Sequence, residues 1–226
     1  MGQAIGEILA PAVGVALSPM PIVAVILMLF TPRARQTGPA FAIGWVLGLV
    51  VVVGIVLLVA DPANMADEEN NPSTTSAIIH LVLGLALVFL AFKQWQGRPK
   101  EGEEPEMPKW MQSIDKITPV VALGFGALMS GLNPKNLIFD IAAGTSIAQA
   151  GLSTAEEIVA MLVFVVLASM TVAGVVIWYL IAGKSAEAKL DAMKTWLTHN
   201  NAVVMAVLLL VIGVSQVGKG IGGLFG

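Results

Sequence analysis

A lysine and an aspartate stand inside a long apolar stretch in the second half of the chain. Lys135 and Asp140 are accompanied there by Asn133, Pro134 and Asn136, while the residues on either side are mostly apolar. Ionisable side chains are rare inside membrane-spanning segments, where they mark substrate or ion pathways. These residues are therefore the first candidates for a binding site.

A second polar break lies near the N-terminus. Ser18 is followed by Pro19 and then by Pro21, again in the middle of an apolar run. Proline lacks an N–H and breaks a helix interior, but it fits the first position of a new helix, particularly after a capping serine or asparagine. The first and fourth apolar runs are therefore predicted to split into half-helices at Pro19 and at Pro134. Ser18 and Asn133 are predicted to cap the second half of each.

The two breaks together predict an anion site. The N-terminal end of a helix carries a positive partial charge and attracts anions, and Lys135 would add a full positive charge to two such ends. The expected guest is a carboxylate, sulfate or phosphate group. The alternative is a simple kink, with its polar groups satisfied by neighbouring backbone.

Asp140 has a different predicted role. Asn133, Asn136, Asp140 and Gly144 recur at helical spacing and share one face. Lys135 lies off that face and five positions before Asp140, so the two are poorly placed to pair within one helix. Lys135 is expected to meet the substrate or another span instead. Asp140 is a candidate for proton coupling, because carboxylates inside membranes form proton relays.

The composition predicts an all-α integral membrane protein. Hydrophobic residues make up 57% of the chain and charged residues 12%, against roughly 25% charged residues in soluble domains. The mean hydropathy is +0.85. A membrane-spanning helix needs about 20 apolar residues, and six runs satisfy this criterion, at residues 4–30, 37–60, 76–92, 119–148, 156–182 and 201–217.

Basic residues predict how these spans are oriented. Ten of the twelve lie in the first, third and fifth joints between spans, and none lies in the second or fourth. Because cytoplasmic loops carry the excess of lysine and arginine, both termini are predicted to lie outside. Spans one and four then run in opposite directions with matching breaks, which is typical of inverted repeats. The predicted organisation is a three-helix repeat at residues 1–95, a cytoplasmic linker at 96–118 and a second three-helix repeat at 119–226.

Several kinds of chemistry are not expected. The chain has no cysteine, and its two histidines, His80 and His199, are far apart in sequence, so no metal or other cofactor is predicted. There is no basic arm for nucleic acid. The sequence contains no constellation of a nucleophile and a base, so we do not expect an enzyme.

Small and hydroxyl-bearing residues give weaker signals. Ala40, Gly44 and Gly48 form a ridge that predicts close helix packing, either within the chain or in a homodimer. Ser169 and Thr171 lie in the fifth span. They either line a path or bond their own backbone.

Four segments of the sequence resemble a known family. They are ALSPMPI at 16–22, TPRAR at 31–35, FAIGW at 41–45 and GLNPKNL at 131–137. In these the chain is similar to the GAP family, the glycopeptidolipid- and sulfolipid-addressing proteins of mycobacteria and relatives, within the LysE transporter superfamily. The resemblance implies an actinobacterial source and a six-span plasma-membrane protein that helps to move surface glycolipids outward. Matched residue by residue, it implies a substrate-binding core of Ser18, Pro19, Pro21, Asn133, Pro134, Lys135 and Asn136.

Three functions are compatible with these observations. The first is export of a glycolipid with a polar or anionic headgroup, which would have membrane lipids as its surroundings. The second is export of a small amphiphilic solute such as an amino acid. The third is a non-transporting accessory subunit of a larger lipid exporter, docked through the linker at 96–118.

Overall fold

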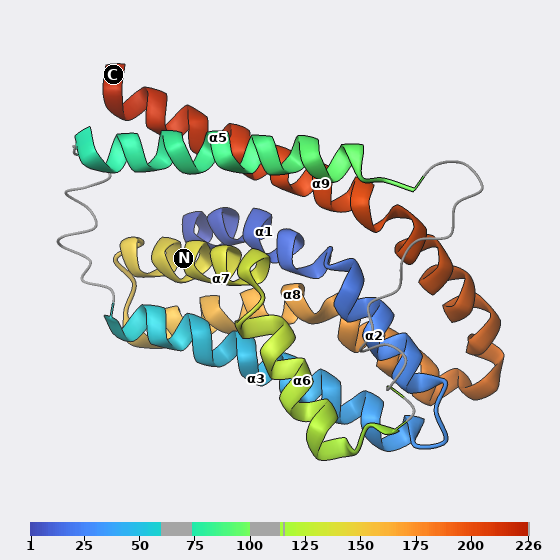
Figure 1. Cartoon of the computed structure of the whole chain (residues 1–226). Helices are drawn as coiled ribbons and strands as arrows, with labels where there is room; N and C mark the ends of the chain where they lie inside the picture. The colour runs from blue at the N-terminus through green and yellow to red at the C-terminus, as the bar shows by residue number, and fades with distance from the viewer. Residues whose placement is uncertain (60–73, 100–113, 115, 226) are drawn as a thin grey trace. The chain divides into compact units, whose positions relative to one another are not determined.

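The computed structural model describes residues 1–59, 74–99, 114 and 116–225, and every regular element in these ranges is helical (Figure 1). The prediction of an all-α fold is confirmed. Most of the second joint, between the runs at 37–60 and 76–92, and most of the linker predicted at 96–118 lie outside the described residues. The helices are α1 (Gly2–Ala16), α2 (Pro19–Leu29), α3 (Ala34–Val59), α5 (Thr74–Gln96), α6 (Pro119–Gly131), α7 (Pro134–Gln149), α8 (Thr154–Ala182), the short 3₁₀ helix η2 (Gly183–Ala186) and α9 (Glu187–Phe225).

Some of these helices are long and apolar enough to cross a membrane. α3 is one, and the helical stretch Thr154–Phe225 contains another. A third is formed by α1 and α2 together, which pass the same test although they are bent by 53° at their junction. These helices are compatible with membrane insertion. The count of six spans and the inverted repeat stay predictions.

Contacts divide the chain into two units. The first comprises Met1–Ala60 and Glu106–Thr198, and the second comprises Asp61–Pro105 and His199–Gly226. All the candidate site residues belong to the first unit. The predicted repeats at 1–95 and 119–226 were based on orientation and break position, and they stay a prediction.

Glycines bring α3 and α6 into close contact in the first unit, where the two helices lie side by side (Figure 1). A Cβ added to Gly44 would collide with the Leu123 carbonyl, and one added to Gly48 would collide with the Ser130 hydroxyl. From the other side, Gly126 fits against the Phe41 carbonyl. The predicted small-residue ridge therefore packs within the chain, and it gives no separate support to a homodimer. This packing positions the end of α6, where the second break begins.

The second unit is held together by small residues repeated every seven positions. They lie along α5 and along the C-terminal part of α9, two helices that run side by side (Figure 1). All six of these residues are buried: Ala77, Gly84, Ala91, Ala206, Gly213 and Gly220. A repeat of seven places small residues on one face of each helix, so the two backbones approach closely.

The contacts of glycines set the direction of this pair. A Cβ on Gly84 would lie 2.6 Å from the Val217 nitrogen, and one on Gly220 would lie 2.6 Å from the Leu81 nitrogen. Leu81 lies opposite Gly220, and the later residue Gly84 lies opposite the earlier residue Val217. The two helices are therefore antiparallel. Beside it, the His80 imidazole Nδ1 and the Gln216 Oε1 are 2.8 Å apart.

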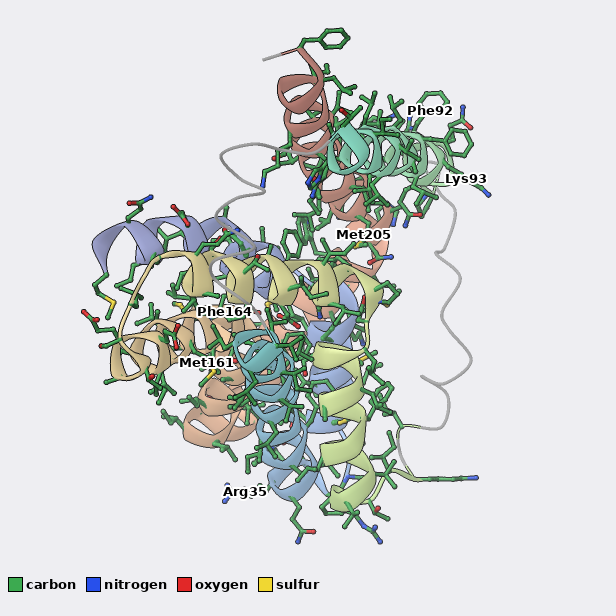
Figure 2. All side chains as sticks on the ribbon, turned by 90° about the vertical axis from the view of Figure 1, so that its left-hand side faces the viewer. Arg35, Phe92, Lys93, Met161, Phe164 and Met205 are labelled. Carbon is green, nitrogen blue, oxygen red and sulfur yellow. The ribbon has the colours of Figure 1, made fainter. Side chains whose placement is uncertain are left out.

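Charged and apolar side chains lie outward in both units. Figure 2 shows Arg35 pointing away from the helices at the start of α3, and Phe92 and Lys93 pointing outward from α5. Phe164, by contrast, is fully buried on α8. Exposed apolar side chains cover much of both units, which suits a hydrocarbon environment.

The helices are interrupted at Pro19 and Pro134, as predicted. α1 ends at Ala16 and α2 begins at Pro19, while α6 ends at Gly131 and α7 begins at Pro134. Each proline occupies the first position of its helix, where its missing N–H costs no hydrogen bond.

Candidate functional site

The site is built around the C-terminal end of α1, where the last backbone carbonyls have no partner within the helix. Here side chains supply the donors. The Ser18 hydroxyl is 2.7 Å from the Val15 carbonyl, and the Thr171 hydroxyl of α8 donates to the Ala16 carbonyl at 2.7 Å. The broken end of α1 is therefore stabilised by a residue beyond it in sequence and by another helix.

Lys135 completes this arrangement from α7. Its Nζ donates to the Leu17 carbonyl at 3.1 Å and to the Ser18 hydroxyl oxygen at 2.8 Å. The same ammonium lies 5.9 Å from the centre of the Phe139 ring. Lys135 is 8% exposed, so its amino group is buried at the negative end of a helix.

Asn136 links the two breaks to each other. Its Oδ1 is 2.9 Å from the Ser18 hydroxyl oxygen, and its Nδ2 donates to the Met129 carbonyl of α6 at 2.9 Å. A hydroxyl has only one proton, so Ser18 donates either to Asn136 or to Val15 at any moment. The two breaks therefore meet through Ser18 and Asn136, and Asn136 is fully buried there.

The two predicted caps behave differently. The Asn133 side chain accepts a hydrogen bond from the Lys135 backbone N–H at 3.1 Å, so it caps α7 as predicted. Ser18 makes no side-chain capping bond to α2. The prediction that Ser18 caps α2 is wrong, because its hydroxyl is used by the preceding helix end and by α7.

The local chemistry differs from the predicted anion site in two respects. Pro19 and Pro21 both lack an N–H, so the start of α2 offers fewer amide donors than an ordinary helix start. The Lys135 ammonium already has two oxygen acceptors. The expectation that Lys135 meets another span is confirmed. Binding of a substrate by Ser18, Pro19, Pro21, Asn133, Pro134, Lys135 and Asn136 stays a prediction.

Asp140 lies one helical turn beyond Asn136 on α7. It is fully buried, and neither carboxylate oxygen has a hydrogen-bond partner. It makes no salt bridge with Lys135, as their spacing predicts; the salt bridge found in the described part of the chain joins Lys194 and Asp191. Asp140 is thus a buried carboxyl group that makes no hydrogen bond to the cluster joining the breaks.

The sequence left the role of two hydroxyl residues in the fifth span open. Thr171 bonds the carbonyl of another helix, which neither alternative described, and Ser169 is buried without a partner. The sequence around a threonine in an apolar helix does not indicate which neighbouring helix its hydroxyl will bond. The bonded carbonyls of α1 were also missed, because a backbone group has no signature in the sequence.

Fold and site together define a class of protein: an all-helical, membrane-compatible chain with two proline-broken helices joined by a buried lysine and asparagine. Comparison with protein families narrows this class. The family model of "Sap, sulfolipid-1-addressing protein" matches residues 8–222, which include both breaks, and the chain belongs to this family. The resemblance noted from the sequence is confirmed at this level. No curated protein and no solved structure matches the chain.

Proposed function

We propose that this protein moves a glycolipid with a polar or anionic headgroup across the plasma membrane. One observation carries the proposal: the Lys135 ammonium is buried where the two broken helices meet. Membership of the sulfolipid-1-addressing family indicates a role in handling such lipids. An enzyme is not proposed.

The ammonium is held by contacts that an anion can replace. Its two acceptors, the Leu17 carbonyl and the Ser18 hydroxyl, are both neutral. An anionic acceptor would add the attraction between two full charges, which is stronger in a buried site than in water. A sulfate or phosphate headgroup would therefore compete for Lys135 and free the end of α1.

The location of the lysine also fits broken-helix transporters in general. In such proteins the C-terminal ends of half-helices coordinate the coupling cation, and their N-terminal ends face anionic substrate groups. Here the ammonium of Lys135 occupies the cation position at the end of α1. We infer that this contact holds the end of α1 until a headgroup replaces it.

The exposed apolar surface of the first unit is suited to contact with the acyl chains of a lipid. Exposed apolar side chains occur on every long helix of the first unit, for example Val51, Ile138 and Val166. The acyl chains would stay in the bilayer while the headgroup passes the polar junction. The excess of basic residues in the odd joints supports an orientation with both termini outside.

Reconstitution of the purified protein tests this function. Vesicles would carry a labelled sulfated glycolipid, a labelled neutral glycolipid with the same acyl chains, or an enclosed labelled amino acid. We expect movement of the sulfated lipid between leaflets, faster than in protein-free vesicles. Movement of the amino acid alone would replace the proposal with solute export. No movement of any of them would favour an accessory subunit that requires a larger exporter.

A further inference from the structure

Asp140 is a carboxyl group in an unusual setting. No part of its side chain is exposed, and neither oxygen has a hydrogen-bond partner. Its neighbours on α7 pack tightly: the Phe139 ring contacts Gly14 of α1, and Gly144 contacts Val56 of α3. An ionised carboxylate in such a place is so costly that the group takes up a proton instead.

No charged partner offsets this cost. Lys135, on the same helix, is engaged by Leu17 and Ser18. Asp140 forms no salt bridge within the part of the chain that the structure describes. The helices packed against α7 are α1, α3, α6 and α8. Their titratable and charged groups, including those at the helix ends, are the Met1 amino group, Glu7, Arg33, Arg35, Lys116, Glu156, Glu157, Tyr179 and Lys184. None of these groups is buried.

The position of Asp140 connects it to the helix breaks. Asn136 lies four residues earlier, about 6 Å along the same face of α7. Asn136 contacts Ser18, and Ser18 accepts a hydrogen bond from Lys135. A change of charge on Asp140 would therefore act one helical turn from the residue that joins the two breaks.

We propose that Asp140 is a proton-binding site: it carries a proton in the conformation described here and releases it when the breaks rearrange. The carboxylate gains a proton from water on one side of the membrane and returns it to water on the other, with no change in any other bond. The proton site itself is independent of the proposed function. Its coupling to lipid export rests on that function.

Infrared spectroscopy of the purified full-length protein tests the proton site directly. At neutral pH we expect a carbonyl band of a protonated carboxyl group that disappears in Asp140→Asn and persists in Glu7→Gln, which alters an exposed carboxyl group of α1. Absence of the band from the wild-type protein would overturn the proposal. If Asp140→Asn does not fold, Asp140→Glu replaces it, and a band whose frequency stays the same in that variant would also overturn the assignment.

A transport measurement separates this site from the proposed function. In vesicles with an imposed pH gradient, wild-type protein should move the sulfated lipid faster than without the gradient, and Asp140→Asn should lose this difference. If the wild-type protein moves the lipid equally fast with and without the gradient, the coupling to Asp140 is contradicted, whereas the proposed transport function is supported. If the infrared band is present but no lipid moves, the proton site is supported and the proposed transport function is contradicted.

Discussion

The two helix breaks differ in where their stabilising groups come from. At the first break, the carbonyls of Ala16 and Leu17 are bonded by Thr171 and Lys135, which lie 155 and 118 residues away in sequence. At the second, Asn133 caps α7, and Asn136 bonds Met129 only seven residues back. The helix start at the second break is thus capped locally, although Asn136 also reaches Ser18. At the first break, Ser18 bonds Val15 locally, but the last two carbonyls depend on other helices.

This difference indicates which part of the site is able to change. A helix start that is capped by its own residue depends less on its surroundings. A helix end held by distant side chains changes when those side chains find other partners. In the proposed cycle, α7 is therefore the fixed donor, and the junction of α1 with α2 is the part that responds.

The largest expected effect comes from Lys135→Met, which removes the charged donor from the first break. Movement of the sulfated lipid should slow roughly tenfold or more, because a hydrogen bond to a charged group contributes about 1.5–3 kcal/mol and about 1.4 kcal/mol corresponds to a factor of ten. The initial rate in vesicles measures this. Lys189→Met, which alters an exposed lysine, is the matched control. Equal rates for Lys135→Met and wild type would contradict the role of the ammonium.

Asn133→Ala tests the local stabilisation of the second break. Loss of an N-cap costs about 1 kcal/mol, and this variant should lower the free energy of unfolding by that amount. Denaturant unfolding in mixed micelles measures the change. Thr118→Ala is the comparison, because Thr118 caps α6 through a longer bond of 3.4 Å at an exposed site. If Thr118→Ala cost more than Asn133→Ala, the cap of α7 would not be the important one.

Thr171→Val gives the sharpest contrast between the two breaks. It removes a hydroxyl from the first break with little change in shape, and a net loss of about 0.5–1.5 kcal/mol is expected. Thr145→Val is the matched control, since the Thr145 hydroxyl bonds only carbonyls of its own helix, those of Ile141 and Ala142. The same unfolding measurement applies. Equal losses in the two variants would mean that the contact between α8 and α1 adds nothing.

Much of the architecture was predictable because its causes are local. Pro19 and Pro134 lack an N–H, and both begin helices as predicted. The ridge of Gly44 and Gly48 predicted close packing, and it packs against α6. The family was predictable from four short segments, two of which contain these prolines, and the family model confirms it.

Other features of the structure leave only a weak signal in the sequence, or none. The seven-residue repeat of Gly84, Gly213 and their neighbours is present in the sequence, but the chain contains many other small residues, so the spacing alone does not single it out. The partner of Thr171 was not readable. Ser18 was assigned to the wrong helix, because a serine before a proline resembles the N-cap of the next helix.

The sequence by itself determined that this chain is helical and apolar, that two helices break at prolines, and that a lysine and an aspartate lie just after one break. These properties depend on a few consecutive residues. Only the tertiary structure decided that Lys135 binds the end of α1, that Asn136 joins the breaks and that Asp140 has no partner. Those outcomes depend on which helices pack together, since a side chain buried between helices bonds whatever group the neighbouring helix presents.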